Sequence, residues 1–134
     1  MKEGRDLKQL GSQKTKYKLD EPNRKILEVF ENKYSGRDYT IQFVFPEFTS
    51  LCPKTGQPDF ATIEVNYIPN MLCIESKALK LYFFAYRQYG SFMETITNKI
   101  LEDLVYVCQP RWMEVKGEFN ARGGTLINVR AVYE

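Results

Sequence analysis

The chain has 134 residues, of which 43% are hydrophobic and 14% aromatic, and its formal net charge is +2. That length fits one compact domain, and the apolar content argues against disorder over most of the chain. The small net charge does not indicate nucleic-acid binding, and no apolar run is long enough to span a membrane, so neither partner is expected.

The chain contains three cysteines and no histidine. The odd cysteine count and the absence of a secretory signal argue against a disulfide framework, so we expect a cytoplasmic protein. Without histidine, Ser-His-Asp and Cys-His catalytic arrangements and most catalytic zinc sites are excluded, and we expect no metal. Carboxylates, lysines, tyrosines and thiols remain as proton carriers.

A polar leader over residues 1–23 is predicted to precede a single domain over residues 24–134. An ordered, Pro- and Gly-rich loop between two strands usually carries function. Apolar periodicity and turn residues predict the following first elements: a short helix over 21–30, a turn over 32–38, a strand over 39–45, a loop over 47–58 and a strand over 61–68.

Two helices are predicted next, over residues 76–88 and 92–107. The first has apolar residues around most of its circumference, which predicts burial on several sides and contacts between subunits. The second is predicted to begin with Ser91 as N-cap and Glu94 completing a capping box. Its expected apolar face consists of Ile96, Ile100, Leu104 and Val107.

Two further strands are predicted over residues 112–119 and 126–133, joined by an Arg-Gly-Gly turn. The order strand, strand, helix, helix, strand, strand indicates an α+β fold, with an antiparallel sheet and two helices on one face. Uncovered sheet edges need partners, so we predict a homo-oligomer.

Cys52 is the strongest candidate for a reactive group, because it lies in the polar loop FTSLCPKTGQPDF two residues before Lys54. A nearby cation favours the thiolate. Asp59, at the start of the next strand, is a candidate proton donor. The alternative interpretation is a packed loop thiol and an ordinary aspartate. Cys73 and Cys108 are interpreted as buried structural thiols.

Five charged side chains are each open to two interpretations. Glu75 and Glu94 either cap the starts of their helices or accept hydrogen bonds from a base-like ligand in a pocket. Lys77, Lys80 and Arg87 fall within an arc of about 80° and form either a solvated basic face or a phosphate-binding surface that faces a cleft. No G-x-G-x-x-G is present, so a Rossmann site is not supported.

The turn at Arg122, Gly123 and Gly124 is a further candidate, because its backbone N–H groups would suit a phosphate. Such a turn more often only connects strands. Both interpretations stay open on the sequence.

Two segments, FPEFTSLCPKTGQPDFATI (residues 45–63) and ESKALKLYFFAYR (residues 75–87), resemble the signatures of one enzyme family. That family is the NADPH-dependent 7-cyano-7-deazaguanine reductases, which make the queuosine precursor 7-aminomethyl-7-deazaguanine, and the length fits its single-module branch. The resemblance implies a tunnelling fold (T-fold). It also implies a decamer of two pentamers, whose subunits close their sheets into a barrel with active sites between them.

The resemblance also implies residue roles. Cys52 is the nucleophile that forms a covalent thioimide with the nitrile, Asp59 is the proton donor, and two NADPH complete the four-electron reduction. The positions implied for 7-cyano-7-deazaguanine binding are Ile74, Glu75, Ser76, Met93 and Glu94. The positions implied for NADPH binding are Lys77, Lys80, Arg87 and Arg122.

Three positions depart from the family pattern. Met93 stands where a histidine usually precedes the glutamate, and a thioether cannot exchange protons as imidazole does. Gln88 replaces an asparagine, and Ala121 replaces a proline.

Three alternatives compete with the reductase. An amidinotransferase relative acting on nitrile-bearing tRNA keeps Cys52 and Asp59 but lacks the NADPH motif, which is intact here over residues 75–82. A low-activity deazaguanine-binding member is the second alternative. A GTP cyclohydrolase-like enzyme is the third, and the absence of histidine disfavours it.

Overall fold

The computed structural model describes residues 21–134, so the predicted leader over residues 1–23 lies almost wholly outside the described part. None of the helices within that part is long and apolar enough to cross a membrane. The elements follow in this order: a 3-10 turn η1 (Arg24–Ile26), β1 (Val29–Glu31), β2 (Ile41–Leu51), β3 (Pro58–Ile68), β4 (Leu72–Ile74), α1 (Ser76–Phe84), α2 (Met93–Cys108), β5 (Trp112–Arg122) and β6 (Thr125–Tyr133).

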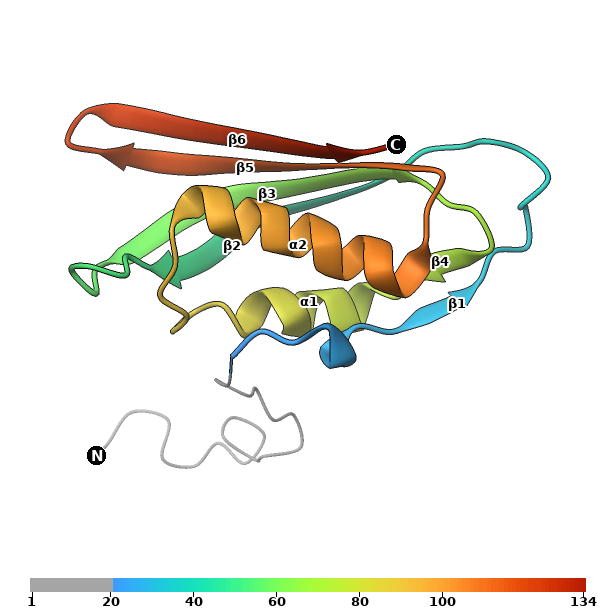
Figure 1. Cartoon of the computed structure of the whole chain (residues 1–134), viewed down its shortest axis with the longest axis horizontal. Helices are drawn as coiled ribbons and strands as arrows, with labels where there is room; N and C mark the ends of the chain where they lie inside the picture. The colour runs from blue at the N-terminus through green and yellow to red at the C-terminus, as the bar shows by residue number, and fades with distance from the viewer. Residues whose placement is uncertain (1–20) are drawn as a thin grey trace, which may run out of the picture.

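Four strands form one antiparallel sheet in the order β2-β3-β5-β6, and both helices lie on the same face of it (Figure 1). Successive side chains of a strand point to opposite faces, so Ile63, Val65 and Tyr67 of β3 are fully buried under the helices. The residues between them are half-buried on the other face. The predicted α+β arrangement is confirmed.

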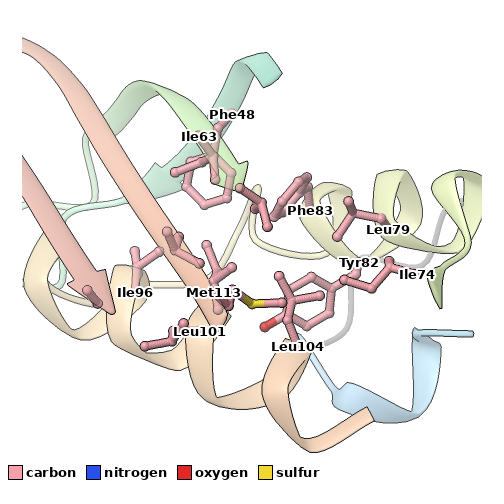
Figure 2. Packing of buried hydrophobic residues seen from close by; sticks show 14 of the residues in the cluster. Phe48, Ile63, Ile74, Leu79, Tyr82, Phe83, Ile96, Leu101, Leu104 and Met113 are labelled. Atoms are coloured by element: carbon pink, nitrogen blue, oxygen red, sulfur yellow. The ribbon is translucent and has the colours of Figure 1, made fainter. Parts of the chain in front are cut away.

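The core fills the space between the two helices and the sheet. Ile96, Ile100 and Leu104 of α2 are fully buried, as their helical spacing predicts. Burying each such side chain stabilises the fold by about 1.5–3 kcal/mol. Figure 2 shows side chains from both helices and the sheet packed in one cluster: Phe48, Ile63, Ile74, Leu79, Tyr82, Phe83, Ile96, Leu101, Leu104 and Met113.

A buried carboxylate on α2 fixes the two helices and η1 to one another. Asp103 accepts hydrogen bonds from Tyr82 Oη of α1 at 2.6 Å, from Lys99 Nζ at 3.1 Å and from Arg24 Nε at 3.2 Å. The Asp103 side chain is 2% exposed, and a carboxylate so deeply buried needs such partners. The spacing of the two helices is therefore set by polar contacts as well as by apolar packing.

The helix predicted over residues 21–30 is wrong. Only the turn at Arg24–Ile26 is helical, and Val29–Glu31 pairs with Leu72–Ile74 in a separate two-stranded sheet. These two strands, β1 and β4, were missed because their pairing joins segments far apart in the sequence. Local helix propensity is readily overridden by such tertiary pairing.

Two helix boundaries also differ from the prediction. The first helix ends at Phe84 rather than at residue 88, and Ala85 is its C-cap. Phe92 is the N-cap of α2 and makes no side-chain capping bond, so the predicted capping box is wrong. The Ser91 N–H instead donates to the Leu51 carbonyl at 3.2 Å, which ties the start of α2 to the end of β2.

The loop between the first two long strands is shorter than predicted. A register shift between Phe45 and Phe48 absorbs Pro46, so β2 continues to Leu51, and β3 begins at Pro58. The proline is tolerated because β2 is an edge strand, where a missing N–H leaves no ladder bond unmade. The longer strands hold the connecting turn, residues 52–57, at the end of the sheet.

The Arg-Gly-Gly hairpin is confirmed as a turn. Arg122 pairs with Thr125, and Gly123 and Gly124 have φ angles of +60° and +82°. Two successive positive φ angles suit glycine and match the twist of the flanking strands. The turn brings Arg122 to the same end of the sheet as residues 52–57.

Candidate active site

Cys52 opens the tight turn between β2 and β3. Its N–H donates to the Gln57 carbonyl at 2.8 Å, and its carbonyl accepts from the Gly56 N–H at 2.9 Å. Gly56 has a φ of +71°, a left-handed conformation that glycine adopts without strain. These bonds hold the partly exposed thiol in a defined position at the end of the sheet.

The surroundings of the thiol favour its ionised form. The Thr55 hydroxyl, then the backbone N–H groups of Thr55 and Lys54, and finally Arg122 lower the pKa of Cys52 to about 7. The sequence interpretation relied on the Lys54 ammonium as the nearby cation. The structure instead brings the backbone of Lys54 and the guanidinium of Arg122 to the sulfur.

Arg122 links the candidate nucleophile, Cys52, to the candidate proton donor, Asp59. Its Nη1 donates to Asp59 Oδ1 at 2.7 Å, and its Nη2 donates to Gln57 Oε1 at 2.7 Å. Contact with Cys52 and the charge of Asp59 raise the pKa of Arg122, so the guanidinium stays cationic. Asp59 is only 4% exposed. A buried carboxylate and a thiol therefore share one cationic partner.

The sequence interpretation missed Thr55 and Gln57 as parts of this cluster. Both lie inside the quoted loop motif, and the signal that could have found them is the hydroxyl three residues after the thiol. Arg122 was predicted to bind cofactor. Its observed contacts are with Asp59, Gln57 and Cys52, and cofactor binding by Arg122 stays a prediction.

The predicted base-binding segment Ile74–Ser76 lies at the other end of α1. Leu51, next to Cys52, accepts from the Ser91 N–H and donates to the Tyr89 carbonyl at 3.0 Å, so the thiol lies near the C-terminal end of α1. Ile74 and Glu75 lie where β4 joins the start of α1 (Figure 1). A helix of 9 residues is about 13 Å long. One chain therefore keeps the thiol and this segment well apart.

Glu75 is the N-cap of α1, as one of its two interpretations predicts. Its Oε2 accepts from the Lys77 N–H and its Oε1 from the Ala78 N–H, both at 2.9 Å. These hydrogen bonds, that of Lys77 first, hold the pKa of Glu75 below its usual value. The Ser76 hydroxyl also donates to Oε2 at 3.5 Å, so Oε1 is the oxygen that keeps a second lone pair for a ligand.

Glu94 has no such capping role. It is exposed at the start of α2, and its carboxylate makes no hydrogen bond or ion pair within residues 21–134. Met93 beside it is half-buried and packs against the core. Glu94 lines an open hollow of about 500 Å³ along α2, together with Arg24, Thr95, Asn98, Lys99, Glu102 and Asp103.

Two of the predicted cofactor-binding cations line one cavity between β2 and α1. Lys80 and Arg87 are both exposed there, and the Arg87 guanidinium lies 5.2 Å from the centre of the Phe84 ring. The two cations suit a phosphate, and the phenylalanine rings that line the same cavity suit a planar ring attached to it. These residues therefore fit part of a dinucleotide. The cavity, of about 200 Å³, is lined by Phe45, Glu47, Thr49, Lys80, Phe83, Phe84 and Arg87.

Lys77, the third cation of the predicted stripe, is exposed on α1 outside that lining. Lys80 of α1 and Arg87 of the segment after α1 therefore line one cavity, while Lys77 lies closer to Glu75 at the start of the helix. The three cations do not form one stripe on the helix, because α1 ends before Arg87.

A partly exposed thiol of lowered pKa, joined through an arginine to a buried carboxylate, is an arrangement that suits an enzyme with a cysteine nucleophile. The profile of the QueF-like protein family matches residues 58–134. The chain belongs to the family of the NADPH-dependent 7-cyano-7-deazaguanine reductases, as its two motifs predict.

Three relatives with that name show the extent of the match. The protein of Chlorobaculum tepidum is 60% identical over 111 residues, which cover 83% of this chain and 95% of that protein. The protein of Nitratidesulfovibrio vulgaris is 55% identical over 125 residues, or 93% and 75% of the two chains. The protein of Bacillus thuringiensis subsp. konkukian is 54% identical over 124 residues, or 92% and 74%.

The fold also matches a solved structure, the apo form of the archaeosine synthase QueF-Like. The TM-score is 0.62 at 20% sequence identity, and the match covers 71% of this chain and 91% of that chain. At that identity the likeness concerns the fold alone, and it fits the predicted T-fold.

Proposed function

We propose that this protein reduces the nitrile of 7-cyano-7-deazaguanine to the aminomethyl group of 7-aminomethyl-7-deazaguanine, with NADPH as reductant, in the biosynthesis of queuosine. Reductases of that name are 53–60% identical to the chain over most of its length. The observation that carries the proposal is the Cys52 thiol of lowered pKa beside the Arg122–Asp59 pair.

The first chemical step uses residues of this cluster. The Cys52 thiolate adds to the nitrile carbon, one π bond of the C≡N group breaks, and the nitrogen takes a proton from Asp59 to give a thioimide. Arg122 holds Asp59 in place and counters the negative charge that proton transfer leaves on its carboxylate.

The cofactor site is built from the basic residues of α1 and the segment that follows it. Lys80 and Arg87 would hold phosphates of NADPH beside the phenylalanine rings of their cavity, with Lys77 on the neighbouring exposed face. NADPH supplies, when bound, the hydride for each of the two two-electron reductions from nitrile to amine. Arg122 would join this set through the N–H donors that its hydrogen bonds to Asp59 and Gln57 leave free.

The base-binding part of the site is completed by a second copy of the chain. Cys52 and the segment Ile74–Ser76 are separated by the length of α1, farther than a bicyclic base reaches. Both outer strands of the sheet, β2 and β6, are open to pairing, and Leu126 of β6 is 66% exposed. We therefore infer a T-fold barrel formed by a homo-oligomer, a decamer of two pentamers, with the active site between subunits.

Met93 and Glu94 complete the expected base-binding set. Met93 offers no imidazole for a proton relay, so the Glu94 carboxylate, which is unpaired within residues 21–134, is the polar group that the start of α2 would present to the base. The free thiols Cys52, Cys73 and Cys108 suit a reducing compartment, and we place the protein in the cytoplasm.

The test combines cofactor consumption with intact mass. The full chain is mixed with 7-cyano-7-deazaguanine and NADPH while the nicotinamide absorbance is followed, and a sample without NADPH is weighed by mass spectrometry. We expect two NADPH consumed per nitrile and a mass gain equal to the whole nitrile. A mass gain without oxidation would indicate a transferase or a binding protein, and the absence of both signals would refute the proposal.

A further inference from the structure

Ser50 is the buried polar side chain that this mechanism leaves unused. It lies in β2 two residues before Cys52, directly opposite Asp59 of β3, and it is 0% exposed. Its hydroxyl makes no hydrogen bond within residues 21–134, and no other buried side-chain nitrogen or oxygen atom in that part of the chain lacks a partner. Buried polar groups in proteins are almost always paired, so this exception calls for a reason.

The position of Ser50 indicates its partner. Residues directly opposite each other in an antiparallel pair point to the same face, with Cβ atoms about 4.5–5.5 Å apart. One hydrogen bond between a hydroxyl and a carboxylate spans that separation. Arg122 occupies Oδ1 of Asp59, whereas Oδ2 accepts no hydrogen bond from residues 21–134. The Ser50 hydroxyl, which is unpaired within residues 21–134, therefore lies on the same face of the sheet as the Asp59 carboxylate, and a side-chain rotation would bring it to Oδ2.

We propose that Ser50 is a positioning residue for Asp59, whose hydroxyl donates a hydrogen bond to Oδ2 during the addition of Cys52 to the nitrile. The proposal rests on the proposed function and deepens it. As the sulfur–carbon bond forms and one C≡N π bond breaks, the nitrogen takes the proton of the Asp59 carboxyl group, and a carboxylate remains. Arg122 then stabilises Oδ1 and Ser50 stabilises Oδ2, which lowers the barrier to proton transfer.

A positioning role and a purely structural role for Ser50 predict different effects of Ser50→Ala on the melting temperature and on the rate. Removing an unpaired buried hydroxyl relieves its desolvation cost, so Ser50→Ala should melt at the same temperature as the native protein or at a higher one. A hydroxyl kept for packing or for a hidden structural bond would lower the melting temperature when removed and leave the chemistry unchanged.

The experiment measures thioimide formation by quenched intact mass in the full chain, without NADPH, over a range of pH and nitrile concentration. We expect Ser50→Ala to form the adduct about tenfold more slowly at saturating nitrile, the cost of one lost hydrogen bond to a charged group. The nitrile concentration for half-saturation should not change. The control Thr62→Val removes a hydroxyl from the helix-free face of β3 and should keep the native rate.

A double-mutant cycle with Asp59→Asn tests whether Ser50 acts through Asp59. Ser50→Ala should slow the native enzyme but scarcely change the residual rate of Asp59→Asn, because the partner oxygen is no longer a carboxylate. Additive losses, an unchanged rate in Ser50→Ala, or a lower melting temperature with an unchanged rate would each overturn the proposal. If the native chain itself forms no adduct, the proposed function fails instead.

Discussion

Cys52 and Cys108 are both free cysteines, but Cys52 lies in a partly exposed turn and Cys108 lies in the core. Cys52 lies in a hydrogen-bonded turn, where the Thr55 hydroxyl and nearby N–H groups lower the pKa of its thiol to about 7. Cys108 ends α2 within the core, is 1% exposed, and burial raises the pKa of its thiol to about 12. The hydrogen-bond donors that reach the sulfur, rather than the residue type, decide which thiol has the lower pKa.

The same contrast holds for the regions around the two thiols. The turn over residues 52–57 is exposed along most of its length and held by backbone hydrogen bonds. The end of α2 is held by apolar packing against the sheet. Changes in the turn should therefore alter chemistry at little cost in stability, and changes in the core should do the reverse.

The largest effect is expected from Cys52→Ala, which removes the nucleophile. It should abolish the mass adduct and lower turnover by about 10³-fold or more, while leaving the melting temperature close to that of the native chain. Cys108→Ala is the matched control and should cost about 1 kcal/mol of unfolding free energy with turnover retained. Full turnover in Cys52→Ala, measured by NADPH oxidation, would refute the mechanism.

The second prediction compares the two thiols in the native protein by alkylation. Raising the pH through about 7 should increase iodoacetamide labelling of Cys52, since its thiolate fraction rises through one half there. At pH about 7 a thiol with a pKa of about 12 is ionised in only about one molecule in 10⁵, so Cys108 should stay unlabelled until the chain unfolds. Peptide mass mapping checks this, and equal labelling of both thiols would contradict it.

The third prediction concerns the guanidinium that joins Cys52 to Asp59. Arg122→Met keeps an unbranched side chain but removes the charge and the donors that bind Asp59 and Gln57. We expect the alkylation midpoint of Cys52 to move to higher pH, and adduct formation to slow by about 10- to 100-fold. Arg130→Met is the control, because Arg130 pairs with Glu114 on the helix-free face. If the pH midpoint of Cys52 alkylation does not change in Arg122→Met, Arg122 does not contribute to the lowered pKa of Cys52.

The smallest effect on chemistry is expected from the scaffold. A Cβ at Gly117 of β5 would lie 2.7 Å from Thr97 Oγ1 and 2.8 Å from Phe119 Cε1. Gly117→Ala should therefore cost about 1–3 kcal/mol of unfolding free energy, measured by urea denaturation, with adduct formation retained below the melting temperature. Gly36→Ala, whose Cβ would meet nothing within 4 Å, should leave stability nearly unchanged. Equal midpoints for the two variants would show that β5 and α2 adjust freely.

Local patterns determined much of the fold and part of the site. Period-two alternation predicted the central strands, and helical spacing predicted the buried face formed by Ile96, Ile100 and Leu104. Cys52 and Asp59 were predicted as site residues because one loop motif carries both, seven positions apart, and the motif indicated the family. These features depend on neighbours in the chain, and such neighbours are visible in the sequence.

Only the tertiary structure decided which groups surround the thiol. Arg122 reaches Asp59 because β5 runs beside β3, and Ser50 faces Asp59 because a bulge at residues 45–48 shifts the register of β2 by one residue. Strands β1 and β4 likewise form because they pair with each other. The physical reason is common to all three. Pairing between distant segments is set by register and packing, and a shift of one residue would turn each side chain to the opposite face.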